Sequence, residues 1–178
     1  MHAFARRVRG FPIVAMCAAI LAGFASASIR SRPLSSSDPP QEAIPAPDLQ
    51  DLRDRIVAAH NRIRADGKLN KLSVSKKLQA AAQAHALDMA DHRKMSHRGS
   101  RGSTLTDRIK AQDYRYRRAG ENVAAGRFTV ERLMKGWMDS PPHKRNILGG
   151  FSQIGVGCAI DEDGKRYWCV NFGLPAGQ

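Results

Sequence analysis

Two neighbouring segments of the chain read GENVAAG at residues 120–126 and WMDSPPHKRNIL at residues 137–148. Between them, apolar residues recur at the i, i+3, i+4, i+7 and i+8 positions of one helical face, and these are Val130, Leu133, Met134, Trp137 and Met138. This spacing predicts an amphipathic helix over residues 130–138. The predicted helix is therefore expected to form a rigid connection between the two polar segments.

The expected ends of this helix are marked by residues that favour or oppose helical backbone. Thr129 is the predicted N-cap, because its hydroxyl can accept a hydrogen bond from a free amide of the first turn. Pro141 and Pro142 lack amide donors and disfavour helical backbone at Ser140, so the helix is expected to stop near there.

Three polar residues outside the periodic pattern are candidate site residues. Glu121 lies before the helix 130–138, and His143 lies just past its end. His97 lies in a loop rich in glycine and serine, and a histidine in a loop beside a core element is a good site candidate. The alternative is an exposed histidine with no role. His85 lies on the inner stripe of a predicted helix and is expected to be a hydrogen-bonded core residue.

The first 27 residues have the pattern of a signal peptide. A basic segment with Arg6, Arg7 and Arg9 precedes an apolar run over residues 13–25, and small residues follow at the expected cleavage site, residues 25–27. The run is too short to cross a bilayer comfortably, because a transmembrane helix needs about 20 apolar residues. An uncleaved anchor is the alternative; after removal of the leader, no transmembrane anchor is expected.

Residues 28–50 form a linker rich in proline and serine, with five prolines between residues 33 and 47. This composition cannot bury apolar surface, so the folded domain is expected over residues 51–178. Further helices are expected over residues 51–65, 75–93 and 105–111. Removal of the leader lowers the net charge from +13 to +10, because the leader carries three arginines and no acids. This charge favours an anionic partner, although solubility alone explains it equally well.

Cys158 and Cys169 remain after the leader is removed, and a residual pair in an exported chain suggests one disulfide. Strand patterns over residues 153–160 and 166–172 flank a turn signal at Asp163-Gly164. If these two residues form the turn, the cysteines lie directly opposite each other, with Cα atoms roughly 4.5 to 5.5 Å apart. We therefore predict a cross-strand bridge, with two buried free thiols as the alternative.

The domain from about residue 54 to 173 resembles the CAP superfamily, which includes cysteine-rich secretory proteins, insect antigen 5 and plant pathogenesis-related proteins. The similarity is greatest to its cysteine-poor bacterial branch. The matching motifs occur in the expected order: His60-Asn61 with Arg64, Ala84-His85 with Met89, Ser96-His97, Gly120-Glu121-Asn122, Trp137 with Ser140 and His143, Asn146-Ile147-Leu148, Gly155-Val156-Gly157, Tyr167-Trp168 and Phe172-Gly173.

The resemblance implies an α+β fold, a three-layer α-β-α sandwich with a small, mostly antiparallel sheet. It also implies a cleft lined by histidine and glutamate, in which His97 and Glu121 match two of four positions. Ser140 and Tyr167 stand where the second acid and the second histidine are expected. His143 belongs to the bacterial motif, and the expected supporting residues are His60, Asn122, Trp137 and Ser140.

No cofactor is expected from the sequence, and the alternative is a divalent metal such as zinc. His97, His143 and Glu121 could form a three-ligand site with an open position. A hydrogen-bonded cluster is the favoured reading, because a glutamate buried near histidines gains by pairing.

The sequence contains no His-Glu-x-x-His helix, Gly-x-Ser-x-Gly turn or phosphate-binding glycine loop, so an enzyme is not the favoured reading. The first hypothesis is an exported binding module, periplasmic or extracellular, whose cleft recognises a lipid-like or cell-envelope ligand near anionic envelope material. No specific nucleic-acid partner is expected. One alternative is a hydrolase in which Glu121 and His97 activate water. The other is a structural envelope protein with a vestigial cleft.

Overall fold

The computed structural model describes residues 48–177, so the predicted signal peptide and most of the linker lie outside the described residues. Asp48 caps the first helix by accepting a hydrogen bond from the amide of Gln50. The elements follow in the order α1 (Leu49–Asp66), β1 (Ser73–Val74), α2 (Lys76–Asp91), α3 (Leu105–Lys110), β2 (Tyr116–Gly126), α4 (Val130–Asp139), α5 (Pro141–Ile147), β3 (Gln153–Ile160) and β4 (Arg166–Pro175).

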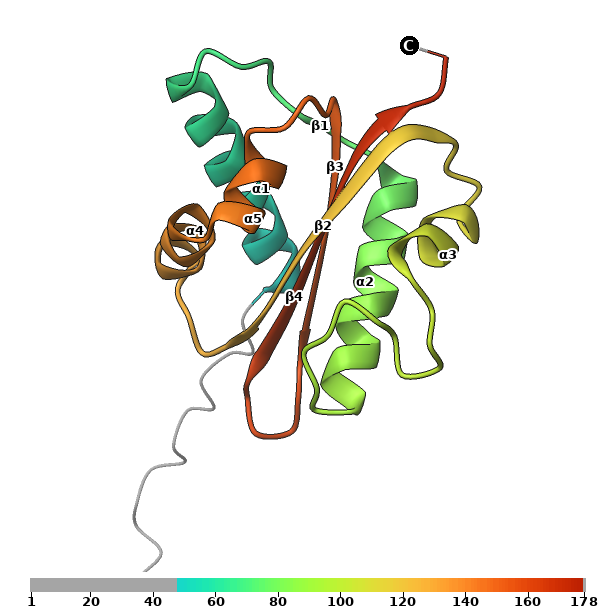
Figure 1. Ribbon diagram of the computed structural model, residues 1–178. Coiled ribbons are helices and arrows are strands. Elements are labelled where there is room, and N and C mark those ends of the chain that lie inside the picture. The colour runs from blue at the N-terminus through green and yellow to red at the C-terminus, as the bar shows by residue number, and fades with distance from the viewer. Residues whose placement is uncertain (1–47, 178) are drawn as a thin grey trace, which may run out of the picture. The chain divides into compact units, whose positions relative to one another are not determined.

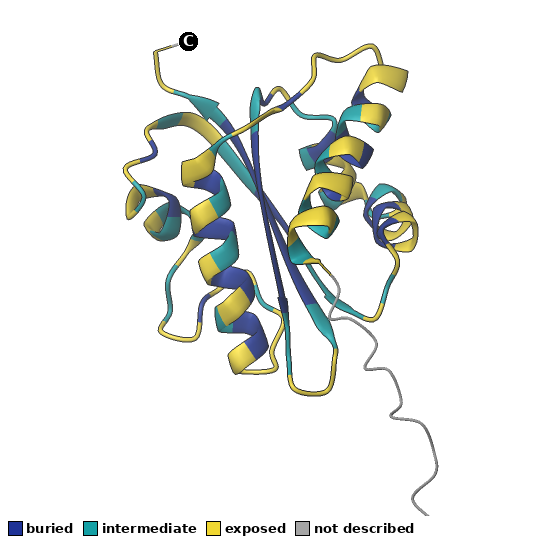
Figure 2. Cartoon of the chain, turned by 180° about the vertical axis from the view of Figure 1, so that it is seen from behind, coloured by how far each residue is buried: buried dark blue, intermediate teal, exposed yellow. Residues whose placement is uncertain are grey.

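The four strands form one sheet with the order β1-β3-β4-β2. The β3–β4 and β4–β2 pairs are antiparallel, and the short β1 pairs with β3 in parallel. Helices α1, α4 and α5 cover one face of the sheet, and α2 and α3 cover the other (Figure 1). The predicted α+β sandwich is confirmed. Burial follows the same layers, since the central strands are buried and the outer helix faces are exposed (Figure 2).

Helix α2 lies against β3 at a distance that only glycine allows. A Cβ atom on Gly155 would lie 2.2 Å from the backbone of Leu78, and one on Gly157 would lie 2.3 Å from the backbone of Ala82. Both clashes involve main-chain atoms of a helix, which cannot rotate away as a side chain could. The glycines and the small residues of α2 therefore bring the helix backbone directly onto the sheet.

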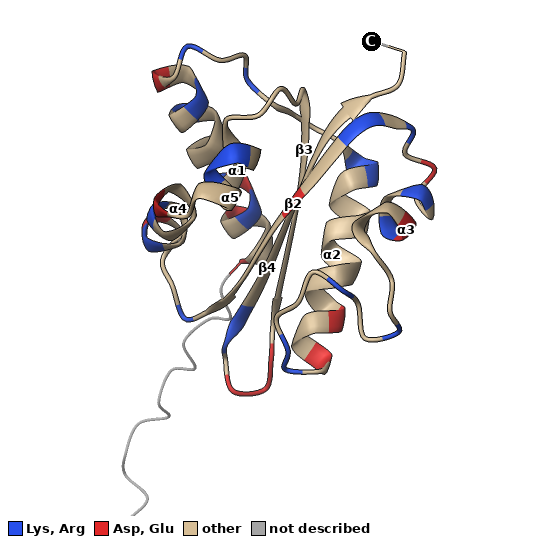
Figure 3. Ribbon diagram, in the orientation of Figure 1, with Lys and Arg blue, Asp and Glu red and all other residues tan. Residues whose placement is uncertain are grey.

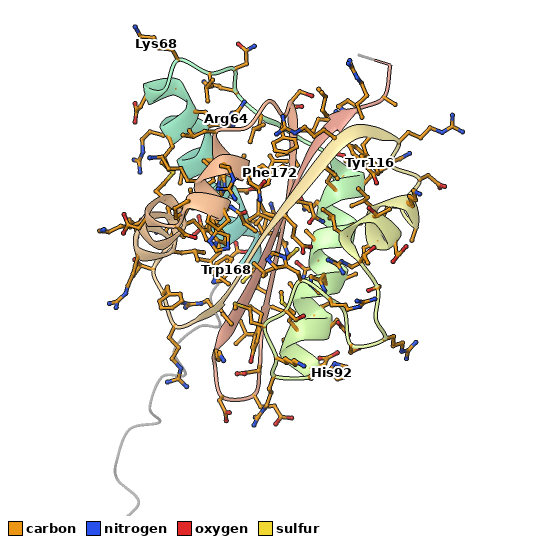
Figure 4. The ribbon with its side chains drawn as sticks, in the orientation of Figure 1. Arg64, Lys68, His92, Tyr116, Trp168 and Phe172 are labelled. Atoms are coloured by element: carbon orange, nitrogen blue, oxygen red, sulfur yellow. The ribbon has the colours of Figure 1, made fainter. Side chains whose placement is uncertain are left out.

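The face of the sheet covered by α1, α4 and α5 holds the larger apolar cluster, and the buried Arg64 lies at the edge of this cluster. The guanidinium of Arg64 donates to the carbonyls of Asn70, Ile147, Gly149 and Phe151 at 2.8 to 3.1 Å (Figure 4). The carbonyl of Ile147 belongs to the last turn of α5, where backbone acceptors have no partner within the helix, and those of Gly149 and Phe151 lie in the loop that follows. One side chain of α1 thus holds α5 and the loop before β3 in place.

Helix α5 was not predicted, because the two prolines were read only as the end of α4. Ser140 instead leaves helical geometry with ψ at 113°, and Pro141 and Pro142 open a new helix. Proline is favoured at the first helical position, where its missing amide has no acceptor in any case. The same two residues therefore end α4 and start α5.

The predicted disulfide is wrong, because both cysteines are free and buried. Residues 161–165 form the turn, and the register places Cys158 opposite Trp168 and Cys169 opposite Gly157. This is a shift of one residue from the expected register, and such a shift moves a side chain to the other face of the sheet. Cys158 consequently lies in the cluster with α1 and α4, whereas Cys169 lies in the cluster with α2.

Over residues 48–177, no helix combines the length and apolar character needed to cross a membrane. Lysine and arginine positions are spread over α1, α3, α4 and α5 and over the start of β2 (Figure 3).

Candidate functional site

The carboxylate of Glu121 lies at the centre of the site, on β2, with only 4% of its side chain exposed. The Nδ1 atom of His97 donates to one carboxylate oxygen at 2.9 Å, and Arg108 Nη2 donates to the other at 2.6 Å. The thiol of Cys169 donates to the second oxygen as well, at 3.3 Å. A buried carboxylate is costly unless it is paired, and these three donors provide the pairing.

Two contacts place His97 beside this carboxylate. His85 is buried on α2, and its Nε2 donates to the carbonyl of Ser96 at 2.8 Å. The predicted role of His85 as a hydrogen-bonded core residue is thereby confirmed. Asp88 accepts from the amide and the hydroxyl of Ser100, which holds the other side of the loop. The His97 side chain itself is 62% exposed, so its ring reaches solvent while its Nδ1 is held by Glu121.

The charges of the site stabilise one another. Burial alone would raise the pKa of Glu121, but the bonds and charges of His97 and Arg108 outweigh it and hold that pKa below the usual value. The hydrogen bond to Glu121 raises the pKa of His97. Burial, together with the charge of Glu121, raises the pKa of the Cys169 thiol well above its usual value. The Glu121 carboxylate is therefore anionic, paired with His97 and Arg108, and the Cys169 thiol stays protonated and donates to it.

An asparagine network joins α5 to β2 and places His143. The side chain of Asn146 donates to the carbonyl of Glu121 at 3.0 Å and to Asn122 Oδ1 at 2.8 Å, and Asn122 Nδ2 donates to the carbonyl of His143 at 3.2 Å. The His143 ring lies 6.4 Å from the ring of Trp137, and its buried Nδ1 has no partner among the described residues.

The structure brings two of the three predicted site residues, His97 and Glu121, into direct contact, and the third, His143, lies on α5. His97 bonds Glu121 directly. His143 approaches from the α5 side, where burial and then the charge of His97 lower its pKa. No hydrogen bond joins His143 to Glu121 among the described residues. His60, predicted as a supporting residue, lies in the core between the rings of Trp137 and Phe172, at 5.9 and 5.5 Å.

A groove with a volume of about 480 Å³ opens along this edge. Backbone and side chains of β2 line it, together with the α4 side and Met95 from the loop after α2. Its lining is mainly apolar, and the indole of Trp137 is fixed there because its Nε1 donates to the carbonyl of Val123 at 3.4 Å. The residues that line the groove are Met95, Val123, Ala124, Ala125, Phe128, Arg132, Leu133, Lys135, Gly136, Trp137, Asp139, Ser140 and His143.

Sequence reasoning missed Arg108 and the contact of Cys169 with Glu121. A signal for Arg108 was present, because it stands at i+3 from Leu105 and next to Ile109, on the inner face of the short helix α3. A charged residue on an inner face requires a buried partner. The capping box between Thr104 and Asp107 fixes the first turn of α3 and so directs Arg108 towards the sheet.

The donor atoms as arranged do not fit a resident divalent metal. One lone pair of each Glu121 oxygen is used by His97 or Arg108, and a guanidinium at 2.6 Å opposes a second cation beside the same carboxylate. Among residues 48–177, no three His, Cys, Asp or Glu side chains gather with the spacing of a metal site.

The model of the CAP family, the cysteine-rich secretory protein family, matches residues 57–172. The chain belongs to this family. YkwD of Bacillus subtilis strain 168 is 35% identical over 104 residues, which are 58% of this chain and 40% of YkwD. The membrane protein YlbC of the same organism is 28% identical over 66% of this chain and 33% of YlbC. The CAP-family chain thus spans less than half the length of these relatives.

Two solved structures have the same fold. An extracellular protein with an SCP domain from Bacillus anthracis aligns with a TM-score of 0.64 and 28% identity, covering 70% of this chain and 41% of that one. An outer surface protein of Borrelia burgdorferi aligns with a TM-score of 0.67 and 23% identity, covering 72% of this chain and 96% of that one. The resemblance noted in the sequence is thereby confirmed.

Proposed function

We propose that this CAP-family protein is an exported binding module whose groove along β2 takes a lipid-like or cell-envelope ligand. The leader pattern of residues 1–27 supports export, as do the extracellular and outer-surface relatives. The observation that carries the proposal is the mainly apolar groove along β2, which has the predicted site residue His143 in its lining. A carboxylate held by a guanidinium is a weak base, so Glu121 is better suited to fixing the site than to activating water.

Gly136 allows a matched test. This residue lines the groove on α4, and a Cβ added there meets no atom within 4 Å. Gly136→Trp fills the groove without disturbing the core, and Gly136→Ala leaves the groove open while improving the helix. Native mass spectrometry after incubation with envelope extract should detect bound material on the wild type and on Gly136→Ala, but not on Gly136→Trp. Equal retention by all three would refute a ligand site in this groove.

A hydrolase is the second candidate, and the exposed ring of His97 favours it. Glu121 holds Nδ1 of a histidine whose ring is otherwise open to solvent, an arrangement that orients an imidazole as a general base. Turnover in a screen of peptides, esters and cell-wall fragments that is lost in Glu121→Gln and His97→Ala would establish this activity. Retention of ligand without turnover supports the binding module. If neither appears, and the variants lose only stability, the cleft is structural.

A further inference from the structure

β2 is an edge strand, and its residues Val123, Ala124 and Ala125 line the groove. The sheet order leaves β2 with one neighbour, β4. The carbonyls of Glu121 and Val123 point away from β4, because they accept from the side chains of Asn146 and Trp137. In a strand, the amide and the carbonyl of one residue point to the same side, so the amides of Val123 and Ala125 also point outward.

These outward amides have no partner in the described part of the chain. Over residues 48–177, no side chain and no loop accepts a hydrogen bond from the amide of Val123 or Ala125, and the outward carbonyl of Ala125 is likewise without a donor. Val123 is only 4% exposed. Buried backbone donors nearly always have a hydrogen-bond acceptor. Amides without an acceptor in residues that line an apolar groove therefore indicate that a bound ligand supplies the acceptor.

The walls of the groove suit an extended chain. Helix α4 contributes Leu133, Gly136 and Trp137 on one side of the edge, and Met95 lies on the other. Side chains of an added strand would point alternately to these two sides. The ring of Phe128, which lies 2.4 Å from where a Cβ on Gly126 would be, closes the end of the groove at the end of β2.

The charge at the rim selects the side chains of such a strand. Lys135 is paired with Asp139, whereas the guanidinium of Arg132 lies over the ring of Phe128, 6.0 Å from its centroid, and has no carboxylate partner among the described residues. The rim therefore carries a net positive charge. An acidic side chain in the ligand would complement it.

We propose that the ligand of this groove is an extended acidic peptide that adds to β2 as a further strand, with its carbonyls accepting from the amides of Val123 and Ala125 and one of its amides donating to the carbonyl of Ala125. The inference rests on the proposed function, because it names the ligand class of the same groove. Main-chain hydrogen bonds supply the affinity in this mode of recognition, and the pockets beside the strand supply the specificity. The peptide would run along the edge between His97 and His143.

The test uses the full chain and a blocked peptide, acetyl-Ala-Val-Glu-Val-Ala-amide, in a titration followed by amide NMR and calorimetry. The amide protons of Val123 and Ala125 should shift downfield and exchange more slowly in the complex. Ala125→Pro removes one outward donor and leaves the β2–β4 ladder intact, since proline is tolerated where an edge amide faces away from the sheet. It should weaken binding about tenfold or more, whereas Arg101→Met, an exposed position outside the groove lining, should bind as the wild type.

Changes in the peptide provide a control that does not depend on the folding of a variant. N-methylation at the positions that donate to β2 should abolish binding, and methylation at the alternate positions should not. Equal effects of both patterns, or binding that survives Ala125→Pro, would overturn strand addition. Retention of envelope lipid without any peptide binding would overturn it and leave the proposed function standing. A concentration-dependent dimer lost in Ala125→Pro would also overturn it, because a second copy would then cover the edge.

Discussion

Replacement of Arg108 by methionine tests whether the buried ion pair holds the site together. The guanidinium is 9% exposed and the Glu121 carboxylate 4% exposed, and the two are joined at 2.6 Å. Methionine keeps most of the aliphatic stem of the arginine, so the change removes the charge and the hydrogen bonds rather than the packing. Arg108→Met also releases the carbonyls of Ser103 and His97, which tie α3 to the His97 loop.

The expected cost follows from the charge left behind. Removal of one partner of a buried pair costs about 3 to 5 kcal/mol, because the other charge stays buried and unpaired. His97 and Cys169 still donate to Glu121, which places the expected loss at about 3 kcal/mol, near the lower limit of this range. For a domain of this size, such a loss lowers the melting temperature by about 10 to 15 °C.

A double-mutant cycle with Glu121→Gln separates the pair from the two single losses. The free energy of unfolding is measured in urea for the wild type, both single variants and the double variant. The double variant should be more stable than the sum of the two single losses predicts, by about 1 kcal/mol or more, as expected for residues in contact. Arg101→Met is the matched control, since Arg101 is exposed in the neighbouring loop and its replacement should change stability by less than about 0.5 kcal/mol. Additive single effects, or an Arg108→Met cost below about 1 kcal/mol, would refute the argument.

Three further predictions concern pH, packing and thiol chemistry. The hydrogen bond to Glu121 raises the pKa of His97 in the folded protein. The stability that this ion pair contributes is therefore fully present below pH 6.5, the ordinary pKa of histidine, and is lost as the pH rises through the pKa of His97 in the folded state. The stability cost of His97→Ala in urea titrations should accordingly be larger at about pH 6 than at about pH 9. Gly157→Ala should destabilise by about 3 kcal/mol or more, because its Cβ meets helix backbone, whereas Gly136→Ala should stabilise by about 1 kcal/mol in thermal melts. Cys158 and Cys169 should resist alkylation in the native mature protein, and both should react after denaturation without added reductant.

The fold was largely accessible from the sequence where hydrophobic spacing was strong. The apolar stripe from Val130 to Met138 predicted α4, whose helix runs from Val130 to Asp139. Helix α5 was not predicted, because Pro141 and Pro142 both end α4 and begin α5 and only the first of these effects was considered. Prediction also failed at the hairpin, because Asp163-Gly164 is a signal for a two-residue turn but stands within a turn over residues 161–165.

The sequence was sufficient to predict the residues His97 and Glu121 of the site, but not the ion pair between Glu121 and Arg108. His97 and Glu121 stood out because each departs from the periodic pattern around it, and the structure joins them at 2.9 Å. The contribution of Arg108 depends on how α3 packs against the edge of the sheet, over a sequence separation of 13 residues from Glu121. No local spacing rule describes such a contact, so a single sequence gives the candidates without the ion pair that fixes them.

The two sulfur atoms are held on opposite faces of the sheet, with the strands themselves between them. The fold of residues 48–177 therefore does not depend on a disulfide between these two cysteines. Its stability should be the same in a reducing and in an oxidising compartment, unlike that of small secreted domains held together by covalent bridges. The hairpin thus makes the stability of the folded domain independent of the redox conditions around it.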